Sequence, residues 1–440
     1  MTDDAGTEPP PQSLWRNRDF LVLWTGDTIS QFGSQFTQLA VPLAAVLTLG
    51  ATALEVGLLE AAGFLPFLLI GLPAGVWVDR VRRRPVMILA DLGRLLALAT
   101  IPLASAFATL TLIHLAAVVV VVGVCTVFFD VAYAGLLPGL VRRSQLPDAN
   151  GKLQASQSAG QVAGPGLAGA VVGAFGAPAA LGIDAATFGV SAAALLGLRQ
   201  REPKPEPKPA GERSMRRELG EGIRYLRRHP LLRPIASCTA TFNFAGGISG
   251  AVLTIFQVRT LGLSPTAIGL IFAVANVGTL LGALVATRLA KALGIGRAIV
   301  VAGVCSGLGG IGIPLANRAT AVPVLVVSSA LIGFGAVAYN VNQVSLRQSI
   351  TPDRMLGRMT ATMRFVVLGV LPIGAVLGGV AGGVFGTRTT LWISAAIASV
   401  SVVWVMLSPV AKLTTVPDPI DPADLLPAAT LATVPGLPTD

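Results

Sequence analysis

The chain has 440 residues, of which 53% are hydrophobic and only 12% are charged, and its mean hydropathy is +0.73. This composition excludes a soluble domain with a polar exterior and indicates a protein whose solvent is lipid. The formal net charge of +10 would suit a nucleic-acid-binding protein, but 29 of the 32 Lys and Arg residues fall on one side of the predicted spans or at its edge. The positive-inside rule explains this asymmetry without nucleic acid and predicts that both termini are cytoplasmic.

About twelve apolar runs are long enough to cross the roughly 30 Å of hydrocarbon in a bilayer as helices. Six precede a charged stretch at 199–230, and six follow it. We therefore predict an all-α polytopic protein of the cell (inner) membrane, with twelve transmembrane helices in two six-helix halves. The runs lie near 20–49, 53–78, 85–107, 111–137, 177–198, 232–257, 265–289, 298–315, 321–344, 359–385 and 391–407, and the fifth of the twelve contains the glycines between 160 and 173.

The chain is expected to divide into five parts. The N-terminus at 1–18 and the tail at 409–440 are expected to be disordered and cytoplasmic. The two helical bundles occupy 19–198 and 231–408, and the central loop at 199–230 combines a proline-rich spacer with an amphipathic helix on the inner leaflet. Similar stretches at 143–155 and 348–361 indicate that the halves arose by duplication.

Polar side chains recur at helical spacing in the first, fourth, seventh and tenth spans. A long polar helix face must contact protein or water and not lipid, so these four spans are predicted to line a cavity for substrate and protons. The first span contributes a stripe at i, i+4, i+7 and i+11. The predicted cavity residues are Asp27, Gln31, Ser34, Gln38, Thr126, Asp130, Tyr133, Asn243, Tyr339 and Asn342.

Two of the cavity residues are acids of the first half. Asp27 and Asp130 each lie about seven residues, roughly 10 Å, from the cytoplasmic end of a span. A buried carboxyl group near another one could carry a proton. The alternatives are that each acid only joins a polar packing network, or that Asp130 pairs with Arg94. Asp91 and Arg94, at i and i+3, are predicted to form a structural ion pair.

The turn between the second and third spans carries one acid and four arginines. The glycine four residues before the acid would let another helix approach closely. Short basic turns of this kind mark the cytoplasmic face. The residues singled out in it are Gly75, Asp79, Arg80, Arg83 and Arg84.

The fifth span is rich in glycine and contains a proline, which suits close packing and bending. Close packing alone is the alternative to a role in choosing the side that opens. The motif residues are Gly160, Gly164, Pro165 and Gly169.

Twelve spans in two halves, a long central loop and a Gly-x-x-x-Asp-Arg cluster together resemble the major facilitator superfamily over about 19–407. The stretches at 72–94, 128–133, 183–188 and 221–233 look most like its macrolide-efflux and enterobactin-exporter branch. The resemblance implies that the basic turn is a gating motif, in which Asp79 docks near the start of the eleventh span, around Met359, to close the cytoplasmic side. A role for the arginines as topology anchors alone is the alternative. The fifth-span motif is similar to the antiporter motif of drug/proton exchangers, with Ala168 where glycine is usual. Arg82 replaces a usual glycine, and the fourth span lacks the arginine of many such antiporters.

The function expected from these features is secondary active transport, with proton-driven export of a small amphipathic compound such as an antibiotic, drug or siderophore by a monomer. No enzyme, cofactor or metal site is indicated, because the two histidines lie far apart and phosphate-loop and metal-ligand spacings are missing. A solute importer of the same fold and a non-transporting membrane sensor or scaffold remain alternatives.

Overall fold

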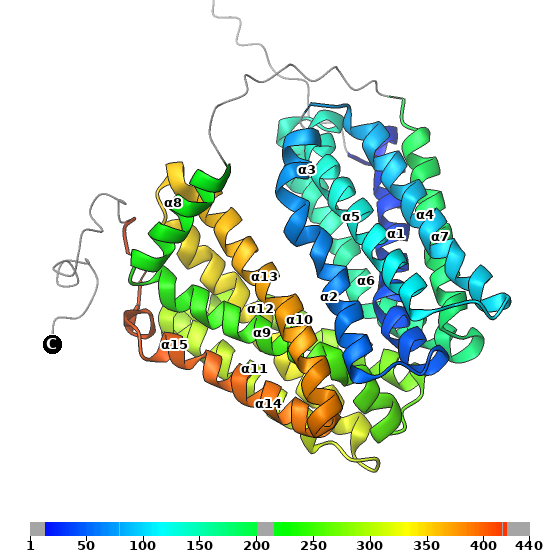
Figure 1. The fold of residues 1–440 in the computed structure, drawn as a ribbon. Coiled ribbons are helices and arrows are strands. Elements are labelled where there is room, and N and C mark those ends of the chain that lie inside the picture. The colour runs from blue at the N-terminus through cyan, green and yellow to red at the C-terminus, as the bar shows by residue number, and fades with distance from the viewer. Residues whose placement is uncertain (1–13, 79, 200–214, 416, 420–440) are drawn as a thin grey trace, which may run out of the picture.

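The computed structural model describes residues 14–78, 80–199, 215–415 and 417–419, and the regular elements in these ranges are helices. Figure 1 shows them as two lobes standing side by side. The expectations about 1–13, the proline-rich spacer at 200–214, the tail from 420 onward and Asp79 lie outside the described residues.

The first lobe contains six spans. The second span is divided by Ile70 into two helices, which follow one another closely. The helices are α1 (Arg18–Leu43), α2 (Ala53–Leu69), α3 (Gly71–Val78), α4 (Arg83–Ala106), α5 (Leu112–Leu140), α6 (Leu146–Phe175) and α7 (Ala177–Leu196).

The second lobe also contains six spans, preceded by a polar helix. Its helices are α8 (Met215–Arg228), α9 (Leu232–Ile255), α10 (Pro265–Leu293), α11 (Ile295–Leu315), α12 (Ala321–Ser349), α13 (Asp353–Phe385), α14 (Thr387–Ser401) and α15 (Val403–Met406). Nine described helices are long and apolar enough to cross a membrane individually. The spans built from α1, α2 with α3, and α6 complete the bundle, so the predicted all-α architecture of twelve transmembrane helices is confirmed.

The two lobes repeat details of the backbone. Both α1 and α9 run into a five-residue π-helix, Ala44–Thr48 and Phe256–Thr260. A glycine with positive φ follows each, at 65° for Gly50 and 72° for Gly262. The side chains of Thr52 and Ser264 then cap the next helix by accepting a hydrogen bond from a backbone N–H of its first turn. These equivalent positions support the duplication that the sequence predicts.

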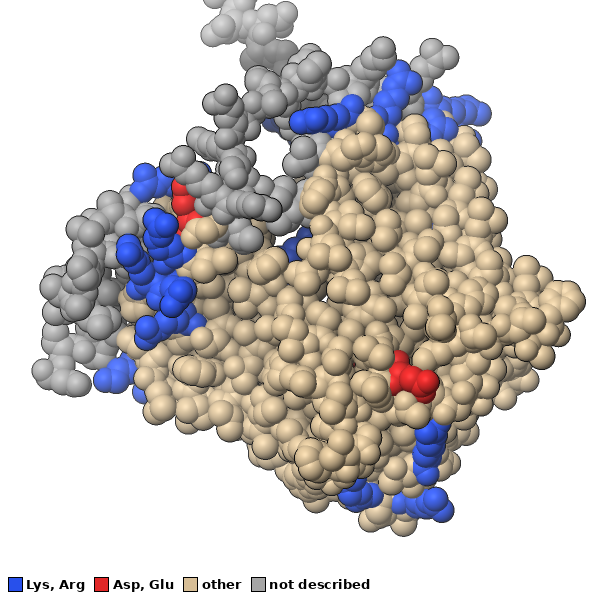
Figure 2. Space-filling view, viewed as in Figure 1, with Lys and Arg blue, Asp and Glu red and all other residues tan. Residues whose placement is uncertain are grey.

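The two ends of the bundle differ in charge. The basic end carries α8 and the turn between α3 and α4, and the distal end carries the α1–α2, α9–α10 and α13–α14 connections. Lys and Arg gather around the basic end in Figure 2, and a broad belt without charge lies below it. Leu96 and Leu284 are each 67% exposed. Such side chains suit contact with lipid, because bilayer hydrocarbon replaces water around the spans.

Three arginines lie at the distal end, against the general asymmetry, and each donates to carbonyl groups at helix ends. Arg259 donates to Ala51 O at 2.9 Å, and Arg388 donates to Ala316 O at 2.9 Å. Arg318 donates to Thr260 O at 3.2 Å. Since the last carbonyls of a helix lack intrahelical partners and carry negative dipole charge, these cations have a local reason to be there.

The lobes touch along glycine-rich seams, where α6 meets α10 and α2 meets α13. They are close at the distal end and diverge toward the basic end in Figure 1. A Cβ atom added to Gly269 of α10 would lie 2.3 Å from Pro165 O and 2.7 Å from Gly169 Cα, both in α6. A Cβ on Gly57 of α2 would lie 2.4 Å from Ala375 O in α13. The seams therefore depend on glycine for backbone contact.

The seam predicts a shift in conformational equilibrium for Gly269→Ala. Overpacking of this kind costs about 1–3 kcal/mol, so we expect the distal closure to weaken by roughly 5- to 150-fold. Hydrogen exchange should rise in the loop at 261–264. Gly383→Ala is the matched control, because a Cβ at Gly383 meets open space. Equal exchange in the two variants would contradict the prediction.

The amphipathic helix α8 packs on the second lobe, whereas its apolar stripe was expected to lie on the inner leaflet. Glu221 accepts a hydrogen bond from Arg358 of α13 at 2.7 Å. Tyr225 and Leu226 are buried, and a Cβ on Gly222 would lie 3.1 Å from Arg358 O. Protein covers Tyr225 and Leu226 because α13 begins at Asp353, before the expected start of its span, and offers a surface for them.

The loop between α8 and α9 contains a fully buried histidine. His229 Nδ1 accepts hydrogen bonds from the backbone N–H groups of Leu231 at 3.2 Å and Leu232 at 3.3 Å. The ring also meets Tyr225 edge-on, with centroids 5.4 Å apart. Burial lowers the pKa of His229 to about 4. The neutral ring therefore caps the start of α9.

This cap predicts a pH dependence of stability. Because the pKa of His229 is depressed in the folded protein, its contribution is present above the unfolded pKa of about 6.5 and is lost as the pH falls toward 4. We expect a loss of about 2 kcal/mol at pH 5. Thermal unfolding in detergent between pH 7.5 and 5 measures it, with His229→Asn as a cap that does not titrate. An identical pH profile for that variant would contradict the prediction.

Candidate functional site

Four carboxyl groups of the first lobe interact electrostatically with one arginine. Arg94 of α4 interacts electrostatically with Asp27 of α1, Asp91 of α4, Asp130 of α5 and Asp184 of α7. Asp91 and Asp184 are fully buried, Arg94 is 5% exposed and Asp27 is 7% exposed. Asp130 is exposed. We call these five residues the acid–arginine cluster.

Arg94 is held by both charge and aromatic rings. Its Nη2 donates to Asp91 Oδ1 at 2.5 Å. Its guanidinium carbon lies 4.3 Å from the ring centroid of Phe129 in α5 and 4.2 Å from that of Phe188 in α7. Such cation–π contacts strengthen when they are desolvated. The cation is therefore fixed between three helices.

The ion pair that the sequence predicts between Asp91 and Arg94 is present, but it does not satisfy every polar atom of the two side chains. Asp91 Oδ2 and Arg94 Nε are buried and lack a hydrogen-bond partner among the described residues. Arg94 forms its ion pair with Asp91 and not with Asp130. Asp130 also interacts electrostatically with Arg364, on α13 of the other lobe.

Asp184 joins two helices of the first lobe. It accepts hydrogen bonds from Thr37 of α1 and, at 3.0 Å, from Thr187 of its own helix. Gly33 leaves room for it, since a Cβ there would lie 2.4 Å from Asp184 Oδ1. Its hydrogen bonds indicate a structural link between α1 and α7.

Glu60 lies at the contact between the lobes. A Cβ on Gly250 of α9 would be 2.3 Å from Glu60 Oε2, so the carboxyl group of α2 rests against the backbone of the second lobe. Glycine at this position is what allows the contact.

The second lobe contains a pocket of about 470 Å³. Its walls come from α9, α11, α12, α13 and α14, and they combine apolar side chains with amides, hydroxyls and two guanidinium groups. This mixture is typical of sites for small organic ligands. We call it the second-lobe pocket, and its lining is Cys238, Thr239, Phe242, Asn243, Gly303, Ser306, Ala336, Val337, Tyr339, Asn340, Gln343, Val344, Arg347, Thr360, Met363, Arg364, Val367 and Ser401.

Two of the predicted cavity residues of the second half line this pocket. The hydroxyl group of Tyr339 lies 2.9 Å from Thr239 Oγ1 and donates to Ile235 O at 3.2 Å, so it fastens α12 to α9. Asn243 donates to Thr239 O at 2.8 Å. Asn342 is elsewhere: it is buried and donates to Ala286 O of α10 at 3.3 Å, so the structure does not place it in the lining.

The polar residues of the first half do not reach the second-lobe pocket. Gln38 is exposed, and Ser34 donates to Ser30 O at 2.9 Å. Thr126 donates to Val122 O in its own helix at 2.8 Å. Tyr133 stacks on Phe129 with centroids 5.9 Å apart and interacts electrostatically with Asp27.

Among the pocket residues that sequence reasoning missed are two amides and two arginines. Asn340, Gln343, Arg347 and Arg364 line the pocket, although the charge asymmetry assigns Arg347 and Arg364 to the cytoplasmic edge. The sequence contained a spacing that could have indicated three of them, Asn340, Gln343 and Arg347. Positions 336, 340, 343 and 347 repeat the i, i+4, i+7, i+11 spacing of the stripe in the first span.

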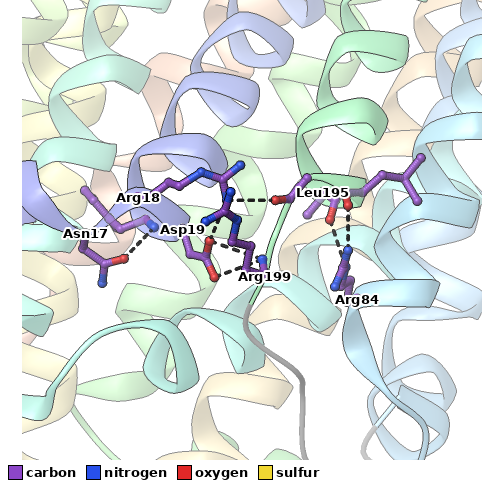
Figure 3. A network of polar contacts seen from close by, with 9 residues as sticks. Asn17, Arg18, Asp19, Arg84, Leu195 and Arg199 are labelled. Atoms are coloured by element: carbon purple, nitrogen blue, oxygen red, sulfur yellow. Dashed lines mark hydrogen bonds and ion pairs between the residues drawn. The ribbon is translucent and has the colours of Figure 1, made fainter.

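Two arginines of the predicted gating motif donate to backbone carbonyl groups of neighbouring helices. Arg83 donates to Gly135 O of α5 at 2.9 Å, and Arg84 donates to Leu195 O of α7 at 2.9 Å. Figure 3 shows Arg84 beside the end of α7, near Asp19 and the backbone of Arg199. Arg84 therefore lies where the dipole of α7 favours a cation. A Cβ added to Gly75 would meet no described atom within 4 Å, and Arg80 is exposed.

The fifth-span glycines serve two interfaces. Gly160 faces Phe32 and Gly164 faces Gln35, both in α1 of the same lobe. Gly169 and the carbonyl group of Pro165 face α10 of the other lobe. The motif therefore lies where contacts within the first lobe give way to contacts between the lobes.

Comparisons with known proteins agree with this architecture. The family model described as "Major Facilitator Superfamily" matches residues 23–370 and 235–433. The chain is 26% identical to multidrug efflux pump Tap of Mycolicibacterium fortuitum over 373 residues, which is 81% of this chain and 88% of that protein. It is 23% identical to macrolide efflux protein A of Streptococcus pyogenes over 405 residues, which is 90% of this chain and 97% of that protein.

A solved structure has the same fold. A bacterial homologue of the iron transporter ferroportin in its inward-facing state gives a TM-score of 0.72 at 20% identity, covering 90% of this chain and 99% of that chain. A bacterial homologue of ferroportin in the outward-facing state gives 0.58 at 18% identity, covering 88% and 98%. With the family model covering most of the sequence, the chain belongs to the Major Facilitator Superfamily and is a multi-pass membrane transporter of small molecules, not an enzyme.

Proposed function

We propose that the protein exports a small amphipathic compound, an antibiotic, drug or siderophore, by alternating access driven by proton entry. The observation that carries the proposal is the pairing of an amphipathic pocket in one lobe with an acid–arginine cluster, buried except for Asp130, in the other. Ionisable groups inside a helical membrane protein are costly and usually mark ion or substrate paths. Export is favoured over import because similar chains carry efflux in their names.

The lobe arrangement supports alternating access. Closed glycine seams at the distal end and divergence toward the basic end are what an inward-facing transporter needs, if the basic end is cytoplasmic. The higher TM-score with the inward-facing ferroportin homologue agrees with this assignment. A monomer would suffice, since the two lobes provide both halves of the path.

Asp27 is the proposed proton carrier. It is buried, shares the influence of Arg94 with three other carboxyl groups, and interacts with Asp130 and Tyr133. Asp184 differs because two threonine hydroxyls hold it. Protonation of Asp27 would leave Arg94 with less opposing charge and so favour a different arrangement of the cluster. Asp130 is the second candidate.

The basic turn is the proposed cytoplasmic latch. Asp79 would dock at the first turn of α13 when the basic end closes, although Asp79 itself lies outside the described residues. This turn begins at Asp353, whereas Met359, near which docking was expected, lies six residues further along the helix. A carboxylate at a helix N-terminus is stabilised by about 0.3–1 kcal/mol when exposed. That magnitude suits a latch that must reopen.

Transport by inverted membrane vesicles tests the function. With the lumen made acidic, an exporter should concentrate a fluorescent amphipathic dye inside the vesicle, and an uncoupler should stop it. Vesicles without the protein are the control. Uptake driven only by the opposite gradient would indicate an importer. Ligand-dependent thermal stabilisation without flux would indicate a sensor or scaffold.

A further inference from the structure

We infer that the second-lobe pocket selects an organic anion, a compound with an apolar body and a carboxylate, sulfonate or phosphate group that binds Arg347 and Arg364. This inference rests on the proposed transport function and narrows its substrate class. It begins with the charge of the lining, which contains two arginines and no acidic side chain among the described residues.

Both guanidinium groups are available for a ligand. In the described part of the chain, neither Arg347 nor Arg364 forms an ion pair or a side-chain hydrogen bond. Arg364 lies eleven residues into α13, about 16 Å from its first residue. Arg347 is half-buried near the end of α12. Cations inside a membrane protein are stabilised by anions. A guanidinium group binds carboxylate and phosphate with two parallel hydrogen bonds.

The protein itself offers too little negative charge to satisfy both cations. Asp130 of the opposite lobe interacts electrostatically with Arg364. Arg347 interacts in this way with Tyr339, and no carboxyl group of the described residues is coupled to it. Arg347 is therefore the stronger anchor for a ligand anion, and Arg364 is shared between ligand and Asp130.

A third group specifies more than charge. Gln343 is 3% exposed, and its Nε2 donates to Asn340 Oδ1 at 3.0 Å. Gln343 and Asn340 both line the pocket, so the wall beside the arginines offers amide groups to a polar part of the ligand.

The remaining wall accommodates an apolar body. Phe242, Val337, Val344, Met363 and Val367 line the pocket beside the polar groups. Together the lining matches an amphipathic molecule with one anionic group and an apolar core. A permanent cation of the same shape would meet two arginines without compensation, which disfavours it.

Two xanthene dyes of opposite charge, fluorescein and rhodamine 123, test the inference because they share a core. We expect purified protein in neutral detergent to bind fluorescein at least tenfold more tightly than rhodamine 123 by fluorescence anisotropy. Arg347→Gln should weaken fluorescein binding at least tenfold and Arg364→Gln at least threefold, with rhodamine binding unchanged or stronger. Arg347→Lys should recover part of the affinity.

The controls separate folding, lipid and function. Arg297→Gln removes an exposed charge of α11 outside the pocket and should leave fluorescein binding unchanged. Displacement of fluorescein by phosphatidylglycerol but not phosphatidylcholine, relieved in Arg347→Gln, would identify a lipid phosphate as the anion. Equal affinity for both dyes, or fluorescein binding indifferent to both arginines, overturns the inference. Transport of rhodamine 123 at the same rate in the parent and in the arginine variants would overturn the anion inference but not the export proposal. Selective binding of fluorescein without flux would overturn the export proposal alone.

Discussion

Arg94→Met is expected to lower the free energy of unfolding by about 3–5 kcal/mol, because it leaves buried carboxyl groups without their cation. Asp91 loses its ion-pair partner at 2.5 Å, and Asp27 and Asp184 lose the positive charge that faces them. The rings of Phe129 and Phe188 also lose the guanidinium between them. Thermal unfolding in detergent and the yield of monodisperse protein measure the effect.

Two variants separate charge from packing at this position. Arg94→Lys keeps the charge but loses the planar group between the rings, so it should be less destabilising than Arg94→Met. The double variant Asp91→Asn/Arg94→Met should regain part of the lost stability, because it removes one of the abandoned carboxylates. If Arg94→Met unfolds at the same temperature as the parent, Arg94 does not organise the first lobe.

Asp27→Asn is expected to reduce proton-driven dye export at least tenfold and to abolish its sensitivity to an uncoupler. The amide matches the carboxyl group in size but cannot gain or lose a proton, so binding of dye to the detergent-solubilised protein should stay within about threefold, or roughly 0.7 kcal/mol. Flux in inverted vesicles under an imposed pH gradient measures the coupling.

Asp184→Asn is the matched control for Asp27→Asn. It is another buried acid of the same cluster, but Thr37 and Thr187 hold its two oxygens by hydrogen bonds. The asparagine oxygen can accept one of these bonds, and the amide N–H can donate to the other threonine hydroxyl. We expect export to remain within about threefold of the parent, or roughly 0.7 kcal/mol in barrier height. Export by Asp27→Asn at the parental rate, with the same response to the uncoupler, would exclude Asp27 as the proton carrier. The same loss in Asp130→Asn would assign the role to the pair.

Much of the fold was predictable because each span can be recognised from its own residues. An apolar run of sufficient length must be helical in lipid, where every backbone polar group needs an internal partner. The same logic fails at the ends of spans, where polar residues can continue a helix. The eleventh span was expected from 359, but α13 begins at Asp353, and the extra turn is the surface on which α8 packs.

The candidate site was less predictable. Successive side chains of a helix point in directions about 100° apart, so neighbouring residues can contact different elements. Asn342 and Gln343 are neighbours in the chain, yet Asn342 packs on α10 while Gln343 lines the second-lobe pocket. From the sequence alone, Arg347 and Arg364 fit basic residues that fix the membrane topology. Only the position of α12 relative to α13 places both in the lining of the same pocket. The acids of the first half were identified, but not the fact that a single arginine faces four of them.

Hydropathy, charge asymmetry and the repeated stretches sufficed to establish a twelve-helix membrane protein with two related halves, because these properties depend on each segment's energy in lipid and water. Which polar residues meet was decided by helix packing. Glycine at 169 and 269 brings α6 and α10 into backbone contact, and that distance sets the orientation of both lobes. A side chain's partners depend on helix rotation and crossing, which arise from contacts between residues far apart in the chain.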